Sequence, residues 1–225
     1  MWLPDPCLAL VTDRRLCRDD ADLARRVARA VAGGVALVQL REKDLPGGPL
    51  LRLAERLRQA TEGRALLFVN ERADVALACG ADGVHLGEEA LPLAAVRRLA
   101  GDRLRIGRSV HSVEGAVAAA SAEGGGADLL LVGTIFPSGS HPGAPAAGVG
   151  LLEAVAQRVT VPFLAIGGVT AENAPQVTRA GARGAAVITA VLAAFDPEAA
   201  ARRLLAALRE GREARRGTLH GEAHR

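Results

Sequence analysis

Ionisable and polar side chains follow short apolar runs at several places in this sequence. In the stretch IGRSVHS, Ser109 and His111 come at the end of such a run. Alternate residues of an extended chain point to the same side, so these two side chains share a face. Because histidine titrates near neutral pH, it can take and return a proton. We expect His111 to be a catalytic proton carrier with Ser109 binding substrate beside it; the alternative is that His111 caps the following helix or fills a polar niche.

A second group alternates in the stretch VQLREK. Gln39, Arg41 and Lys43 are spaced two residues apart, and Lys43 is the only lysine in the chain. On an extended strand end the three side chains face one way and form a polar wall with two positive charges. Arginine grips carboxylates and phosphates through two parallel hydrogen bonds. We expect all three to bind substrate; the alternative is that they form surface salt bridges with Glu42 or Asp44.

Two glycines in the stretch AIGGVT indicate a phosphate site. Gly167 and Gly168 separate an apolar run from a helical pattern, which leaves their backbone N–H groups free to approach an anion. Ile188 and Thr189 end the last apolar run, and we expect their N–H groups to complete the phosphate site. A tight turn that needs glycine for its geometry alone is the alternative.

The elements that must position these residues alternate along the chain. Eight apolar runs, each followed by a helical pattern, within 225 residues predict one (β/α)₈ TIM barrel over residues 1–210, with a basic disordered tail over 211–225. In this fold the carboxyl ends of the strands carry the chemistry, and the last two strand ends hold phosphate. An open doubly wound sheet is disfavoured, because no GxGxxG follows the first strand. The expected strands are Leu8–Val11, Val35–Leu40, Ala65–Val69, Gly83–Leu86, Leu104–Gly107, Leu129–Val132, Pro162–Ile166 and Ala185–Ile188. The expected helices are Asp20–Ala32, Pro49–Ala60, Arg72–Cys79, Leu91–Leu99, Val113–Ala122, Leu151–Arg158, Ala171–Ala180 and Pro197–Glu210.

Composition excludes several kinds of partner. The net charge of +3 comes mostly from the tail, and only 2% of the residues are aromatic, so we expect no nucleic-acid binding. Without a long apolar run or a leader pattern, we expect a soluble cytoplasmic protein that does not enter membranes. Cys7, Cys17 and Cys79 lack the spacing of a metal site and are expected to be reduced thiols. The Gly- and Pro-rich segment 137–150 is long enough to form a lid over a site.

Six stretches carry a resemblance to a known family. They are VQLREK (38–43), VNERADVAL (69–77), ADGVHLGEE (81–89), GTIFPS (133–138), AIGGVT (165–170) and VITAV (187–191). In their order and spacing they resemble the thiamine-phosphate synthase and thiazole tautomerase superfamily over roughly Leu8 to Leu208. The resemblance implies a barrel that binds a small phosphorylated thiazole, with the phosphate on the Gly167 and Gly168 amides and with Asn70 among the substrate-binding residues.

The two branches of this superfamily imply different chemistry. Synthases join a hydroxymethylpyrimidine diphosphate to a thiazole phosphate through a carbocation-like state, which requires Mg²⁺ and several cations. Tautomerases move a proton on a thiazole carboxylate phosphate and need an acid/base group but no metal. Where synthases carry two metal-binding aspartates and a loop lysine, this chain has Glu71, Ala90 and His141. Glu71 could still bind a metal ion, whereas Ala90 cannot, although Glu88 or Glu89 could replace it after a loop shift.

On these residues we expect a thiazole tautomerase, an isomerase of thiamine biosynthesis that needs no cofactor and uses His111 to move the proton. The alternative is a thiamine-phosphate synthase that uses Mg²⁺ at Glu71. A non-catalytic homologue that binds the phosphate ligand is a third interpretation. His85 is interpreted as a packed strand histidine. The sequence does not fix the oligomeric state, and a homo-oligomer stays open.

Overall fold

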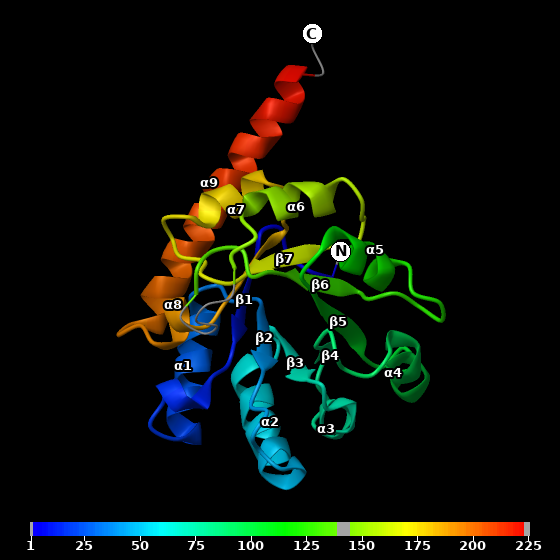
Figure 1. The fold of residues 1–225 in the computed structure, drawn as a ribbon. Helices are drawn as coiled ribbons and strands as arrows, with labels where there is room; N and C mark the ends of the chain where they lie inside the picture. Colours follow the sequence, from blue (N-terminus) through cyan, green and yellow to red (C-terminus); the bar gives the residue numbers. More distant parts are fainter. Residues whose placement is uncertain (1, 139–144, 223–225) are drawn as a thin grey trace.

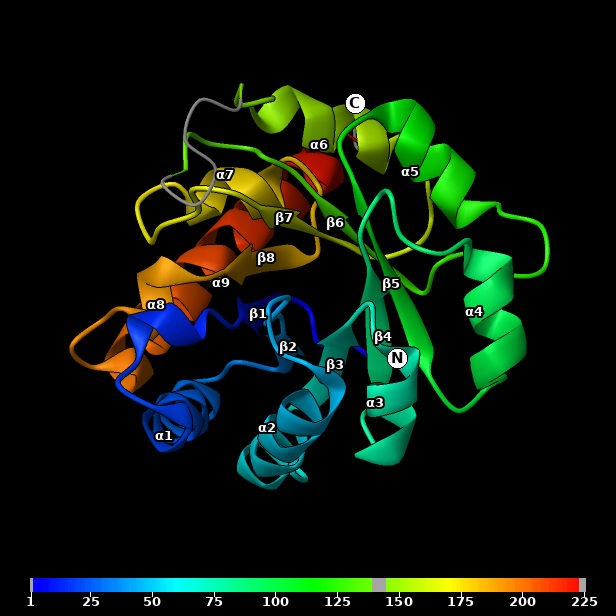
Figure 2. The same ribbon diagram turned by 60° about the horizontal axis from the view of Figure 1, so that its bottom comes forward.

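Parallel strands pair in chain order and close into a barrel in the computed structural model, which describes residues 2–138 and 145–222 (Figures 1 and 2). The ring is completed where β8 pairs with β1, with Leu8 opposite Ala185. This confirms the predicted (β/α)₈ barrel. The strands are β1 (Cys7–Val11), β2 (Leu37–Leu40), β3 (Leu66–Asn70), β4 (Gly83–Leu86), β5 (Arg105–Val110), β6 (Leu129–Val132), β7 (Phe163–Ile166) and β8 (Gly184–Val187).

Helices form an outer ring around the strands (Figure 2). Two short elements, η1 and α8, were not predicted, because each is shorter than the stretch in which helical periodicity can be recognised. The helical elements are η1 (Arg14–Leu16), α1 (Asp20–Ala32), α2 (Gly47–Thr61), α3 (Ala73–Ala78), α4 (Leu93–Ala100), α5 (Val113–Ala120), α6 (Val149–Ala156), α7 (Ala174–Arg179), α8 (Thr189–Leu192) and α9 (Pro197–Glu222).

Strand β1 shows how the apolar residues divide between two layers. Leu8 and Leu10 pack in the layer between the strands and the helices. Cys7, Ala9 and Val11, which alternate with them, belong to a second cluster inside the barrel. Since both faces of the strands are covered, nearly every strand position is apolar, as parallel sheets require.

Helix α9 continues beyond the point where we expected the chain to become disordered. It runs to Glu222, and its end projects past the rim of the barrel (Figure 1). Gly211 lies where α9 crosses α7, and a Cβ there would be 2.1 Å from the carbonyl oxygen of Pro175. Arg212 Nε lies 2.7 Å from Asp5 Oδ1, which ties the helix to the amino terminus. The glycine that suggests a helix end is therefore a close-packing position inside the helix. Within residues 2–138 and 145–222, neither α9 nor any other helix has the length and apolarity to cross a membrane.

Candidate active site

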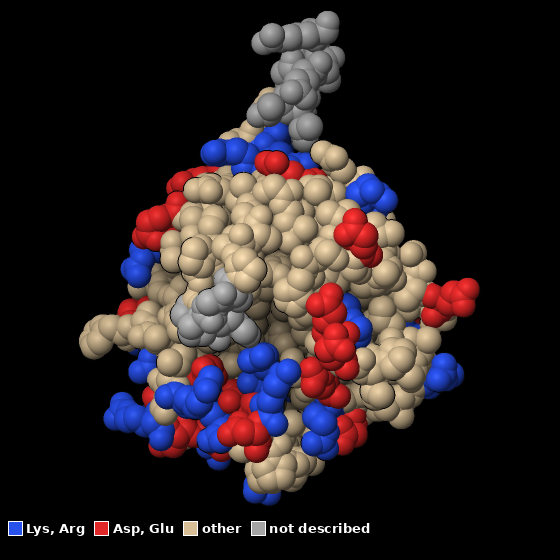
Figure 3. Space-filling model, in the orientation of Figure 1, with Lys and Arg blue, Asp and Glu red and all other residues tan. Residues whose placement is uncertain are grey.

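A cavity of about 600 Å³ opens at the carboxyl ends of the strands. Figure 3 shows a hollow on this face of the molecule, with Lys and Arg side chains grouped below it and Asp and Glu side chains along another edge. Its apolar wall includes Val11, Leu131, Ile166 and Ala186 from four strands of the barrel. The volume falls in the range of small-molecule sites, and an apolar wall with a few convergent polar groups is typical of them.

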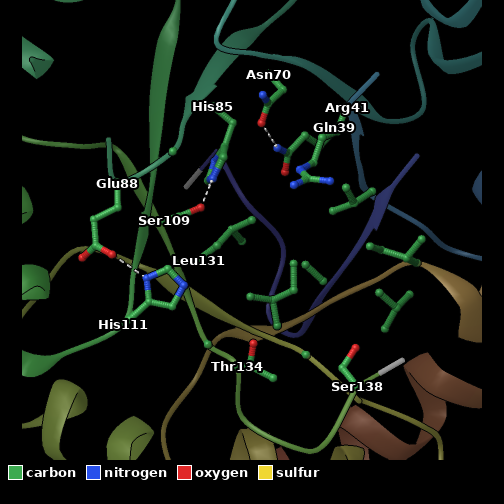
Figure 4. Close-up of a pocket in the computed structure, with 18 of the residues that line it drawn as sticks. Gln39, Arg41, Asn70, His85, Glu88, Ser109, His111, Leu131, Thr134 and Ser138 are labelled. Atoms are coloured by element: carbon green, nitrogen blue, oxygen red, sulfur yellow. Dashed lines mark hydrogen bonds and ion pairs between the residues drawn. The ribbon is translucent and has the colours of Figure 1, made fainter. Parts of the chain in front are cut away.

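The end of β2 and the neighbouring end of β3 form a polar wall. Gln39, Arg41, Lys43 and Asn70 all line the cavity, as their spacing predicts. Gln39 is buried, and its Nε2 donates to Oδ1 of Asn70 at 3.0 Å, so each amide fixes the other. In Figure 4 the Arg41 guanidinium lies beside the Gln39 amide and faces the cavity.

The carboxylates next to these cations in the sequence point elsewhere. Glu42 and Asp44 both pair with Arg14 instead, with Glu42 Oε2 lying 3.9 Å from Arg14 Nε. Within the described part of the chain, Arg41 has no carboxylate at ion-pair distance. The alternative that Arg41 and Lys43 form surface salt bridges with Glu42 or Asp44 is therefore wrong, and the Arg41 guanidinium is left for a ligand.

Lys43 and Glu71 face each other at the rim of the cavity. Lys43 Nζ lies 3.5 Å from Glu71 Oε1, and both side chains are partly exposed. Glu71 has a positive φ of 59°, a conformation that is uncommon for residues other than glycine and that clusters at functional sites. Its Oε1 lies so close to Gly87 that a Cβ there would be 2.7 Å away. The turn after β3 thus holds this carboxylate between Lys43 and the β4 loop.

Glu71 is the side chain that fits a magnesium ion best. Mg²⁺ usually binds one or two carboxylates and takes its other oxygens from water and substrate phosphates. Ala90 has no side-chain oxygen, and Glu88 makes a close contact of 2.7 Å with His111, whereas the contact of Glu71 with Lys43 is longer, at 3.5 Å. No group of three or more His, Cys, Asp or Glu side chains lies together in residues 2–138 and 145–222. The residues would therefore fit an ion that binds Glu71 and takes its other oxygens from water or from a bound ligand, and not an ion enclosed by protein ligands alone.

Ser109 is held by a buried histidine. His85 Nε2 lies 2.8 Å from Ser109 Oγ, and both residues line the cavity (Figure 4). Burial, with smaller effects from Arg108 and Arg41, lowers the pKa of His85 to about 3, so the imidazole is neutral at physiological pH. Gly107 makes room for the ring, because a Cβ there would lie 2.5 Å from His85 Nδ1. His85 is thus a packed strand histidine, as interpreted, and it also orients Ser109.

His111 lies at the cavity rim immediately after β5. Its Nδ1 is 2.7 Å from Glu88 Oε2, and the side chain is about half exposed. Arg108 points away from the cavity, and its Nη2 donates to the Glu88 carbonyl oxygen. Helix α5 is capped by Ser112, whose Oγ accepts from the Gly115 N–H at 3.0 Å. His111 therefore does not cap this helix, whereas its contact with Glu88 agrees with the alternative of a polar niche and leaves Nε2 to face a ligand.

The predicted phosphate residues are only partly brought to the cavity. Gly167 and Ile188 line it, whereas Gly168 and Thr189 are not among the described lining residues. Gly168 has a φ of 61°, and a Cβ on it would lie 2.3 Å from the Pro137 carbonyl oxygen. Both backbone conformation and close packing therefore require glycine here. Thr189 begins the four-residue helix α8, whose amino terminus has no side-chain cap.

Several residues near the cavity were not singled out from the sequence as site residues. Thr134 and Ser138 line it from the loop after β6, and the stretch GTIFPS that contains them was the available signal. Thr12 and Glu42 form a buried hydrogen bond behind Arg41 that no local pattern indicates. Of the expected lid, residues 139–144, which include His141, lie outside the described part of the chain.

Comparisons with known proteins agree with one another. A family model described as thiamine monophosphate synthase matches residues 8–191. The chain is 47% identical to a thiamine-phosphate synthase of Mycobacterium sp. (strain JLS), covering 92% of this chain and 94% of that protein. It is 45% identical to one of Anaeromyxobacter dehalogenans, covering 88% of each. Among solved structures, thiamine phosphate pyrophosphorylase from Pyrococcus furiosus superposes with a TM-score of 0.81 at 37% identity, covering 92% of this chain and 96% of that one.

These relatives overturn the expected isomerase. The tautomerase interpretation was wrong, because proteins that are 45% and 47% identical over most of the chain are named thiamine-phosphate synthases, which are transferases. The interpretation depended on His111, on Ala90 in place of a carboxylate and on His141 in place of a loop lysine. The loss of the carboxylate at Ala90 leaves Glu71, and one carboxylate with substrate oxygens is a common way of holding Mg²⁺.

Proposed function

The chain belongs to the thiamine monophosphate synthase family, and on this premise we propose that it is a thiamine-phosphate synthase. The reaction joins a hydroxymethylpyrimidine diphosphate to a thiazole phosphate and releases pyrophosphate. Both substrates are anionic, so one cavity must hold two phosphate-bearing groups at separate places.

The observation that carries this proposal is the arrangement of the cavity walls. Arg41 and Lys43 come from the end of β2, whereas Gly167 and Ile188 come from the ends of β7 and β8. Two cationic side chains suit a diphosphate, because their charges compensate its own. Backbone N–H groups at a glycine turn suit a phosphate monoester. We therefore assign the diphosphate to the β2 wall and the thiazole phosphate to the β7–β8 wall.

The residues of this cavity can support the chemistry step by step. The bond between the pyrimidine methylene carbon and the diphosphate oxygen breaks, and its electron pair leaves with the diphosphate. The thiazole nitrogen then donates its lone pair to the methylene carbon and forms the new C–N bond. Arg41 and Lys43 compensate the charge that grows on the leaving group, and in the Nε2–H tautomer of His85 the Ser109 hydroxyl donates a hydrogen bond to it. Glu71 would hold a Mg²⁺ ion, and the ion would supply further charge neutralisation to the leaving group.

The remaining groups orient the pyrimidine and exclude water. The Gln39–Asn70 pair presents its second amide hydrogen and carbonyl oxygen to the ring edge. Val11, Leu131 and Ile166 form an apolar wall against which a carbocation-like intermediate is shielded from solvent. Because water is excluded, the carbocation-like intermediate reacts with the thiazole nitrogen and is not hydrolysed.

Complementation tests the proposal in a cell. A bacterial strain that lacks thiamine-phosphate synthase should grow without added thiamine when it expresses this chain. Arg41→Ala, expressed to the same level, should fail to restore growth, because it removes a cation from the diphosphate wall. No growth with the wild-type chain present in soluble form would contradict the proposed function.

A further inference from the structure

A buried polar pair lies directly behind the cationic wall of the cavity. Thr12 at the end of β1 is 1% exposed, and Glu42 beyond the end of β2 is 6% exposed. Buried polar groups cost free energy unless they are hydrogen-bonded, so the hydrogen bonds of this pair show which part of the structure it supports. Neither side chain lines the cavity within the described residues.

The hydrogen bonds of this pair converge on the backbone of Arg41. Thr12 Oγ1 donates to Glu42 Oε1 at 2.6 Å and accepts from the Arg41 N–H at 3.0 Å. The Arg14 N–H also donates to Glu42 Oε1, at 3.0 Å. The Thr12 N–H donates to the Gln39 carbonyl oxygen at 2.9 Å. Thr12 therefore fixes the backbone on both sides of Leu40, at the two residues whose side chains reach the cavity.

The same contacts fix the position of the Glu42 carboxylate. Glu42 stands between Arg41 and Lys43 in the sequence, and a free carboxylate there would compete with a substrate anion for both cations. It points to the opposite side of the extended chain and is occupied by Thr12 and Arg14. Burial raises the pKa of this carboxyl group, and the hydrogen bonds from Thr12 and Arg14 counteract part of that rise.

We propose that Thr12 and Glu42 are positioning residues for the diphosphate substrate: they fix the backbone at Arg41 and keep the Glu42 carboxylate out of the cavity, so that the Arg41 guanidinium stays available to the anion. This inference rests on the proposed function for the identity of the anion. It implies a selective effect, because the thiazole phosphate is assigned to the far wall at Gly167 and Ile188. Loss of the pair should weaken binding of the diphosphate substrate and leave binding of the thiazole phosphate unchanged.

The first test replaces Thr12. Thr12→Val keeps the shape of the side chain and removes its hydroxyl, which leaves the Arg41 N–H without its acceptor and leaves Glu42 with Arg14 as its remaining partner. We expect the dissociation constant of inorganic pyrophosphate with Mg²⁺, measured by calorimetry, to rise roughly tenfold. The Arg41 amide should also exchange its hydrogen faster with solvent. Thr12→Ser retains the hydroxyl and should restore both measurements to near the wild-type values.

The second test separates the hydrogen bonds of Glu42 from its charge. Glu42→Gln keeps an oxygen acceptor for Thr12 and Arg14, so pyrophosphate affinity should stay within about threefold of the wild type. Glu42→Ala should weaken it roughly tenfold. Asp44→Asn is the matched control, since Asp44 also pairs with Arg14 but is exposed and makes no contact with Thr12. It should leave the affinity unchanged.

Selectivity separates positioning from a general loss of structure. In Thr12→Val the KM for the pyrimidine diphosphate should rise while the KM for the thiazole phosphate stays the same. An equal rise in both KM values, or unchanged pyrophosphate affinity in Thr12→Val and Glu42→Ala, would overturn the inference. Because pyrophosphate binding and amide exchange need no turnover, they test the positioning even if the wild-type chain makes no thiamine phosphate, an outcome that would refute only the proposed function.

Discussion

The imidazole of His111 and the carboxylate of Glu88 meet at the cavity rim, with Nδ1 lying 2.7 Å from Oε2. One residue follows β5 and the other follows β4, so the contact joins two adjacent loops of the barrel. Figure 4 shows the Nε2 side of the ring turned towards the cavity. A carboxylate that binds one ring nitrogen fixes the orientation of the ring and leaves the other nitrogen for a ligand.

The His111 side chain should contribute to substrate binding, but less than Arg41. Because it is about half exposed, solvent weakens its polar interactions with a ligand. We expect His111→Ala to lower kcat/KM by about three- to tenfold in steady-state assays. Glu88→Gln keeps an oxygen acceptor for His111 Nδ1, so it should lower kcat/KM less than Glu88→Ala does. Wild-type kinetics in His111→Ala would show that the imidazole does not contact either substrate.

Glu71 should set the magnesium requirement. Glu71 is the carboxylate that we assign to the ion. Glu71→Ala should therefore raise the Mg²⁺ concentration for half-maximal activity by about tenfold or more. Glu71→Asp should lie between this variant and the wild type. Glu89→Gln serves as the control, since Glu89 is exposed in the neighbouring loop and does not line the described cavity. If Glu71→Ala and the wild type depend on the Mg²⁺ concentration in the same way, Glu71 does not bind the metal ion.

His85 should make the fold sensitive to acid. Burial lowers the pKa of His85 to about 3, against an ordinary value of 6.5. In the unfolded chain His85 therefore becomes protonated below about pH 6.5, whereas in the folded chain it stays neutral down to about pH 3. The stabilisation from neutral His85 is complete above pH 6.5 and is lost as the pH falls towards 3, by about 2 kcal/mol at pH 5.

Denaturant unfolding at pH 8 and pH 5 measures this loss. His85→Gln should lose less stability between the two pH values than the wild type, because it has no ring to protonate. Ser109→Ala keeps His85 buried and should retain most of the wild-type difference. If His85→Gln and the wild type change equally with pH, the imidazole does not carry the effect.

The glycine turn after β7 offers a matched pair of substitutions. Gly168 and Gly63 have nearly the same φ, 61° and 68°. A Cβ on Gly63 meets nothing within 4 Å, whereas one on Gly168 would lie 2.3 Å from the Pro137 carbonyl oxygen. Gly63→Ala should therefore cost only the conformational strain, about 1 kcal/mol. Gly168→Ala should lower the free energy of unfolding by more than this and should raise the KM for the thiazole phosphate. If both substitutions lower the free energy of unfolding equally and the KM is unchanged, Gly168 serves only the geometry of the turn.

Much of the barrel and one wall of the site could be predicted from local patterns. Apolar runs alternating with helical periods specify βαβ units, and their number specifies closure. The period of two along β2 places Gln39, Arg41 and Lys43 on one side, and all three line the cavity. These features depend on residues close together in the sequence, which is why a sequence pattern records them.

Features that depend on contacts between distant residues could not be predicted. The hydrogen bond from Thr12 to Glu42 spans 30 positions and leaves no periodic trace. Gly211 suggests a helix end by its type, and only the packing of α9 on α7 shows that it lies inside a helix. The expected branch was wrong for a similar reason: it was inferred from single positions such as His111 and Ala90, whereas the ligand that a cavity binds depends on all of its walls together.

The most direct test of the central claim measures both products from the purified wild-type chain. Equal amounts of hydroxymethylpyrimidine diphosphate and thiazole phosphate, with Mg²⁺, should yield thiamine phosphate and pyrophosphate in equal amounts, and neither product when thiazole phosphate is omitted. Pyrophosphate without thiamine phosphate, or no consumption of either substrate by protein shown to be folded, would contradict the assignment as a thiamine-phosphate synthase.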